Sequence, residues 1–150
     1  TTREGVKTAF FAWLYGSKSA TTSTEGAALR KFYDKKKILD SYWDGNRVKT
    51  PLQKEIADVD EHHALNYIVQ STTAELTLLQ AMKIDYLLRT HAKKSKLCCI
   101  IHDAIVIDFS SQDEHLLPAI KSLMSSTKFG NFKINISSGN NLGNLRELPV

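Results

Sequence analysis

Four side chains near the start of the sequence have types and a spacing that suit the binding of an anion beside a flat apolar group. They are Arg3, Lys7, Phe11 and Tyr15, which follow one another at intervals of four residues. Because four residues advance about 40° around an α-helix, the four side chains would form one stripe, with two cations followed by two aromatic rings. This stripe suits a nucleoside triphosphate, whose phosphates meet the cations while a ring packs on the sugar or base. The same spacing fits an amphipathic helix with core aromatics and rim cations.

A second candidate is the dipeptide His102–Asp103, which separates two runs rich in β-branched residues. The runs, residues 96–101 and 104–109, predict a β-hairpin with His102 and Asp103 at or near its tip. Without other information a polar dipeptide at this place is ordinary turn chemistry.

The elements that would position these residues follow an α+β order, with helices first and then a hairpin, a helix and a strand. Helices are predicted over residues 2–15, 25–39, 60–89 and 111–125, and a last strand over residues 129–136. Residues 41–56 predict a hairpin or an irregular crossing around the turn sequence Asp44–Gly45–Asn46. The segment 17–26 is expected to be a loop, and the Gly- and Asn-rich tail 137–150 to be irregular.

Composition fits one folded domain and sets few limits on function. The 150 residues include 20 Lys and Arg against 16 Asp and Glu, a net charge of +4, with 42% apolar residues. No apolar run is long enough to span a bilayer and no secretory pattern is present, so we expect no membrane partner and a cytoplasmic location. The adjacent Cys98 and Cys99 are poorly placed for a mutual disulfide, which agrees with a reducing compartment.

Three motifs then resemble those of family A DNA polymerases, the polymerase I group. The stripe and the glycine that follows it, Gly16, resemble the O-helix motif of the fingers, also called motif B. The segment from Asn66 to Glu75, with Gln70 inside it, resembles a segment of the long palm helix, and His102–Asp103 resembles motif C. Residues 48–52 and 63–67 are similar to the viral branch of the family. Three landmarks in the family's order are more specific than any one of them.

The resemblance implies that the chain takes part in DNA-directed DNA synthesis. In this reaction a primer hydroxyl attacks the α-phosphate of a deoxynucleoside triphosphate, and two Mg²⁺ ions about 4 Å apart stabilise the attacking and leaving oxygens. Asp103 would be a carboxylate ligand of these metals, and Mg²⁺ favours such hard oxygen ligands. Lys7 and Arg3 would bind the triphosphate and offset its developing charge. Magnesium, deoxynucleoside triphosphates and a primed DNA template are therefore the expected cofactor and partners.

The other matched residues would contact the sugar, the template and the primer. By the resemblance, Phe11 would pack on the sugar and influence discrimination against dideoxynucleotides, while Tyr15 would lie by the templating base. Gly16 would end the helix where the template bends. Contacts with primer and template in the minor groove, which check shape more than sequence, would come from three residues: Asn66, Gln70 and His102. An amide pair one helical turn apart, such as Asn66 and Gln70, could equally bond across its own helix.

The sequence departs from the family pattern at several positions. Ala104 replaces the Glu that usually follows the motif C Asp, His62 stands where an Arg is usual in the bacterial enzymes, and Ser71 replaces a Gly. Motif A, which carries the other essential metal carboxylate, has no counterpart in this sequence. We therefore expect the C-terminal part of a longer or split enzyme, inactive without an N-terminal portion that carries motif A, the thumb and possibly an exonuclease.

On this interpretation residues 1–58 form part of the fingers and residues 59–150 part of the palm. The alternative is a non-catalytic module that binds nucleic acid or acts as a scaffold and keeps polymerase-like architecture. The retained Arg3, Lys7 and Asp103 argue against this alternative, while Ala104 and His62 argue mildly for it.

Overall fold

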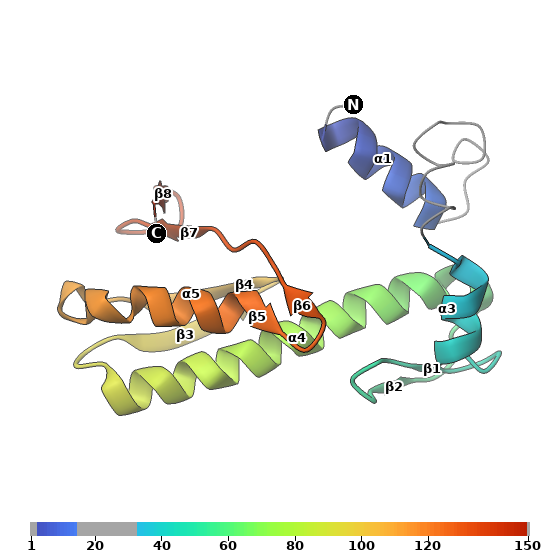
Figure 1. Ribbon diagram of the computed structural model, residues 1–150, viewed down its shortest axis with the longest axis horizontal. Helices are drawn as coiled ribbons and strands as arrows, with labels where there is room; N and C mark the ends of the chain where they lie inside the picture. Colours follow the sequence, from blue (N-terminus) through green and yellow to red (C-terminus); the bar gives the residue numbers. More distant parts are fainter. Residues whose placement is uncertain (1–2, 15–32, 150) are drawn as a thin grey trace. The chain divides into compact units, whose positions relative to one another are not determined.

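The computed structural model describes residues 3–14 and 33–149 (Figure 1). Its helices and antiparallel strand pairs belong to the α+β class that the sequence predicts. The chain divides into two compact units, residues 1–73 and 74–150. Among the helices in the described ranges, none combines the length and the hydrophobicity that crossing a bilayer requires.

The first helix, α1 (Arg3–Leu14), packs one side into the core of the first unit. Trp13 and Leu14 are buried and Phe10 is half-buried against them. Val6, one helical turn before Phe10, is 46% exposed. Lys35 Nζ donates a hydrogen bond to the Leu14 carbonyl at 3.2 Å. This bond gives a carbonyl in the last turn of α1 a partner, because the last carbonyls of a helix have no donors left inside it.

The next elements are α3 (Lys35–Tyr42) and the short hairpin β1 (Val48–Lys49) and β2 (Glu55–Ile56). Asp34 caps α3, since its carboxylate accepts from the Lys37 N–H at 3.0 Å. Of the helix predicted over residues 25–39, residues 25–32 lie outside the described ranges. The prediction is wrong at residues 33 and 34, which are not helical, because Asp34 is the extended capping residue of a helix that begins at Lys35 and ends at Tyr42, beyond the predicted end.

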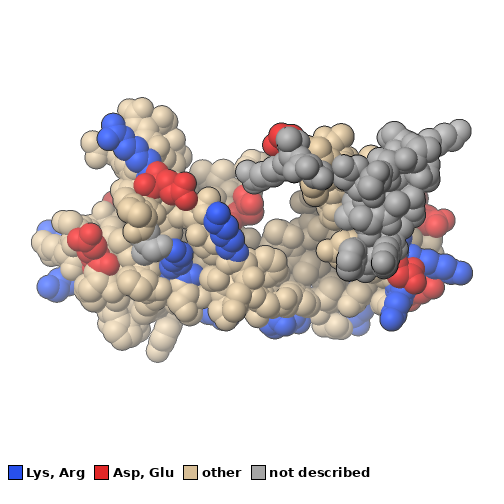
Figure 2. Space-filling view, turned by 45° about the horizontal axis from the view of Figure 1, so that its top comes forward, with Lys and Arg blue, Asp and Glu red and all other residues tan. Residues whose placement is uncertain are grey.

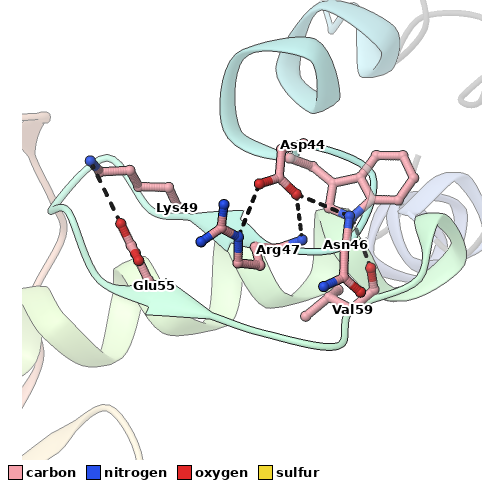
Figure 3. A network of polar contacts seen from close by, with 7 residues as sticks. Asp44, Asn46, Arg47, Lys49, Glu55 and Val59 are labelled. Carbon is pink, nitrogen blue, oxygen red and sulfur yellow. Dashed lines mark hydrogen bonds and ion pairs between the residues drawn. The ribbon is translucent and has the colours of Figure 1, made fainter.

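A polar network holds the turn predicted at residues 44–46 (Figure 3). Asp44 accepts hydrogen bonds from the N–H groups of Asn46, at 3.0 Å, and of Arg47, at 2.7 Å. These bonds, that to Arg47 first, hold the pKa of the Asp44 carboxyl below its usual value. Gly45 has φ +102, a conformation that L side chains rarely adopt. The indole of Trp43, the residue before the turn, donates to the Val59 carbonyl at 2.8 Å.

The long helix α4 (Glu61–His91) agrees with the prediction of a helix over residues 60–89. Asp60 precedes it and accepts from the His63 N–H at 3.0 Å, as a capping residue does. Each unit uses its own stretch of α4. Ala64, Leu65 and Ile68 belong to the core of the first unit, whereas Ile84 and Leu88 belong to that of the second. The compact division falls after Thr73, inside the helix, and the fingers and palm boundary at 58/59 stays a prediction.

The second unit packs the hairpin β3 (Lys96–Ile101) and β4 (Ala104–Asp108) against helices. After the hairpin come a 3₁₀-helix, η2 (Ser111–Leu116), and α5 (Leu117–Ser125). In Figure 1, α5 runs alongside this hairpin and the C-terminal part of α4. Leu116 and Ile120 are buried with Ile84 and Leu88, and the hairpin covers them with half-buried apolar side chains.

After the hairpin the prediction of a helix over 111–125 is confirmed in its bounds, although the helix is 3₁₀ in η2 and α-helical only from Leu117. Pro118 lies in the first α-helical turn, where its missing N–H costs nothing. The next prediction is wrong. The strand predicted over 129–136 is interrupted. Pairs of short strands form instead: β5 (Ser126–Thr127) with β6 (Gly130–Asn131), and β7 (Ile136–Ser138) with β8 (Arg146–Leu148). Alternating apolar residues do not make a strand where no neighbour pairs with the backbone. The tail predicted as irregular supplies β8 and the part of β7 that follows Ile136.

Candidate functional site

The turn His102–Asp103 lies at the tip of the β3–β4 hairpin, as the sequence predicts. Ile101 pairs with Ala104, so these two residues alone connect the strands, and both side chains are exposed. His102 has φ +55, in the left-handed region. Histidine is among the residues enriched in that region, although glycine would occupy it without steric cost. The turn thus presents the Asp103 carboxylate to solvent at the tip of the hairpin.

A β-bulge orients this hairpin on its core. The pairs are Leu97 with Ile107 and then Cys99 with Val106, so Cys98 is an extra residue without a partner in the ladder. Side chains alternate between the faces of a strand, so residues 97 and 100 would face opposite sides of a regular one. The extra residue lets Leu97 and Ile100 share the face of Ile105 and Ile107. Sequence reasoning did not foresee the bulge, because nothing in two adjacent cysteines distinguishes it.

A buried carboxylate fixes the base of the same hairpin. Asp113, fully buried in η2, accepts from the N–H groups of Lys93 at 2.6 Å, Lys94 at 3.0 Å and Ser95 at 2.8 Å. It also accepts from the Ser95 hydroxyl at 2.7 Å, whose oxygen accepts from the Ser110 N–H at 2.9 Å. These donors, the Lys93 N–H first, hold the pKa of Asp113 far below its usual range, although burial opposes them. One side chain thereby ties the entry of β3 to the exit of β4.

The described residues do not by themselves build a magnesium site. Among residues 3–14 and 33–149, no group of three His, Cys, Asp or Glu side chains could hold a metal ion. The hairpin tip offers the Asp103 carboxylate, and Mg²⁺ needs near-octahedral oxygen coordination. A metal bound there would take its other ligands from substrate phosphates, water or residues outside these ranges.

The predicted nucleotide-binding residues that are described lie on α1. Lys7 and Phe11 are one helical turn apart and both are exposed, Phe11 to 40%. The aromatic residue that α1 buries is Trp13, whose ring centroid lies 5.7 Å from that of Phe10. Phe11 is therefore not a core residue of the first unit, contrary to the plain amphipathic interpretation of the stripe. Arg3 begins α1, and Tyr15 and Gly16 lie outside the described residues.

The predicted primer and template residues occur in both units. Asn66, half-buried, and Gln70, exposed, are one turn apart on α4 in the first unit, whereas His102 lies in the second. Within single elements, the structure brings together Lys7 with Phe11 on α1, Asn66 with Gln70 on α4, and His102 with Asp103 in the hairpin turn. On the face that Figure 2 presents, positive and negative side chains are interspersed.

Comparison with known proteins adds no relative: no family model, curated protein or solved structure matches this chain.

Proposed function

We propose that this chain is the C-terminal fingers and palm portion of a viral-type family A DNA polymerase. It would act in template-directed nucleotidyl transfer together with a polypeptide or segment that supplies motif A. The proposal rests on the three motifs of the sequence and on one structural observation. That observation is the two-residue turn, which holds the Asp103 carboxylate exposed at the tip of a hairpin with a fixed base.

Two features of the first unit add support. Lys7 and Phe11 project from α1 one turn apart, so an ammonium group and an aromatic ring are available to one ligand. The Lys7 ammonium can bind phosphate oxygens as a point charge, and the Phe11 ring can pack on the sugar. Asn66 and Gln70 lie on one side of α4, where two amides can reach neighbouring minor-groove acceptors. Bound Mg²⁺ would polarise the phosphate and stabilise the attacking and leaving oxygens.

The first experiment measures whether α1 binds a nucleotide. Trp13 lies about two turns beyond Lys7 on the same helix, so its fluorescence can excite a methylanthraniloyl group on dATP bound near Lys7. The full chain is titrated with this nucleotide and Mg²⁺. We expect saturable energy transfer, and a Kd at least about tenfold weaker for Lys7→Gln, because the variant cannot make a charge-assisted hydrogen bond to phosphate.

Lys36→Gln is the matched control, since Lys36 is an exposed helical lysine in the same unit. It should bind as the wild type does. Equal affinities for wild type and Lys7→Gln would contradict the assignment of α1 as the nucleotide helix. Binding of DNA without any binding of nucleotide would favour the alternative, a non-catalytic module that binds nucleic acid.

A further inference from the structure

Most of the net positive charge of the chain lies in its last quarter. Residues 117–149 contain four Lys or Arg and one Glu, a net charge of +3, whereas the whole chain carries +4. The same segment contains two phenylalanines, which lie in the near-palindromic run from Lys128 to Lys133, Lys-Phe-Gly-Asn-Phe-Lys. Cations next to aromatic residues are the composition that single-stranded nucleic-acid sites use.

The structure exposes both phenylalanines of this run. Lys128 and Phe129 form the turn of the β5–β6 hairpin, and Phe132 and Lys133 follow β6 directly. Phe129 is 46% exposed and Phe132 is 49% exposed. The Lys128 ammonium lies 5.1 Å from the centroid of the Phe129 ring, so charge and ring are presented together.

Hydrogen bonds hold the base of this hairpin. The Phe132 N–H donates to the Ser125 carbonyl at 2.9 Å, and the Ser125 hydroxyl donates to the Phe132 carbonyl at 2.7 Å. The Gln80 amide on α4 donates to the Ser126 carbonyl at 2.5 Å. Two exposed rings on a fixed backbone lose little freedom when a flat ligand stacks on them, which favours binding.

An open groove continues from the hairpin along α5. It has a volume of about 900 Å³, with Lys121 and Ser125 of α5 on one side and Phe132, Lys133 and Asn135 on the other. The rest of the lining is mostly apolar and includes one acidic residue, Glu147, which the two lysines outnumber. The groove therefore offers cations for phosphates, the Asn135 amide for base edges and apolar surface for base faces.

We propose that the hairpin Ser126–Lys133 and this groove bind single-stranded DNA. The phosphates would contact Lys121, Lys128 and Lys133, and bases would stack on Phe129 and Phe132. Charge complementarity and the exposed rings together identify single-stranded DNA as the ligand, because a ligand with anionic groups alone would not stack on the phenylalanine rings. The inference does not rest on the proposed polymerase function, because every residue in it lies outside the motifs that suggest polymerase activity.

The test is the fluorescence anisotropy of a labelled oligothymidylate of about 20 nucleotides, long enough to fill such a site, titrated with the full chain. We expect Phe129→Leu with Phe132→Leu to weaken binding by about tenfold or more, because leucine cannot stack on bases although it stays apolar. Lys128→Gln with Lys133→Gln should flatten the slope of log Kd against log salt by about 1.4, because two phosphates would no longer be neutralised by the protein.

The control is the double variant Lys36→Gln with Lys54→Gln, which changes the net charge as much as Lys128→Gln with Lys133→Gln does, but on exposed lysines of the first unit. It should leave the Kd nearly unchanged. An equal weakening in this control would overturn the proposal, since binding would then follow net charge alone. Unchanged binding by the double Phe variant, with an unchanged melting curve, would also overturn it, as would tighter binding of a duplex of the same length. Loss of nucleotide binding in Lys7→Gln would bear on the polymerase assignment alone, and loss of oligonucleotide binding in the double Phe variant would bear on this site alone, so the two failures are distinguishable.

Discussion

Asp113 accepts two hydrogen bonds from Ser95, one from its backbone N–H at 2.8 Å and one from its hydroxyl at 2.7 Å. The two residues are 18 positions apart, and the β3–β4 hairpin lies between them. The same carboxylate binds the N–H groups of Lys93 and Lys94, so it supplies acceptors for three successive backbone donors. This interaction closes the base of the hairpin whose tip carries Asp103.

Replacement of Asp113 by Asn should destabilise the second unit at neutral pH. An amide has one acceptor oxygen in place of two, so backbone N–H groups among residues 93–95, of which that of Ser95 is buried, would lack partners. We expect a melting temperature lower by at least about 5 °C. Circular dichroism melts of the variant and the wild type at pH 7 measure the difference.

The pH dependence of this effect has a definite sign. The pKa of Asp113 is lowered in the folded state, so its contribution to stability is fully present above the unfolded pKa and is lost as the pH falls through the folded value. The gap in melting temperature between the wild type and Asp113→Asn should therefore narrow below about pH 4. A gap that stays constant from pH 7 to pH 3 would contradict the charged, hydrogen-bonded state of Asp113.

The left-handed conformation of His102 predicts opposite effects of two substitutions. His102→Gly should leave the free energy of unfolding unchanged or raise it by up to about 1 kcal/mol, since glycine accepts φ +55 without strain. His102→Val should lower it by about 1–2 kcal/mol, because a β-branched residue fits this region poorly. Urea titration of both variants gives the comparison, and the reverse order would show that the turn has another backbone conformation.

Deletion of Cys98 should be tolerated, although loss of one residue from a strand normally turns the following side chains to the other face. Cys98 is the extra residue of the bulge, so its removal leaves a regular ladder with Leu97 and Ile100 still on the core face. Deletion of Val106 is the control, because it would put Ile105 and Ile107 on opposite faces. We expect a near-native melting curve for the first variant and loss of cooperative unfolding for the second. Equal damage from both deletions would refute the bulge.

Gly139→Ala should disrupt the β7–β8 hairpin. A Cβ atom on Gly139 would collide with the backbone carbonyl oxygen of Asn144, which cannot move without breaking the turn. Gly143→Ala is the control, since its Cβ would meet only the Asn141 side chain at 3.3 Å. Limited proteolysis of residues 139–145 should cut the first variant several times faster than the second. Similar cleavage rates would contradict the close approach.

The sequence predicts the elements whose patterns arise from their own side chains. The spacing of apolar residues predicts α4 and the buried end of α1, and two β-branched runs around His102–Asp103 predict the hairpin and its tip. Asp44–Gly45–Asn46 predicts its turn, because each residue there favours one. The α+β class follows from the order of these elements.

Features that depend on distant partners were not predictable. The β7–β8 pair joins two weakly patterned stretches across a loop, and the register of Ile136 with Leu148 leaves no trace in either of them. The anchoring role of Asp113 depends on residues 93–95, and a lone acidic residue in a helix start predicts only a favourable place near the helix dipole. The run from Lys128 to Lys133 is visible in the sequence, but the exposure of its rings is not.

The most direct test of the proposed polymerase function is primer extension with Mg²⁺. The chain is assayed together with the polypeptides that accompany it in its natural source, and the wild type is compared with Asp103→Asn. Glu114→Gln, an exposed carboxylate of the same unit, is the control. We expect template-directed extension by the wild type and the control, and a rate at least about a hundredfold lower for Asp103→Asn, because a metal ligand would be removed. Extension at the wild-type rate by Asp103→Asn, or no extension by the wild-type assembly, would contradict the proposed role of the hairpin tip.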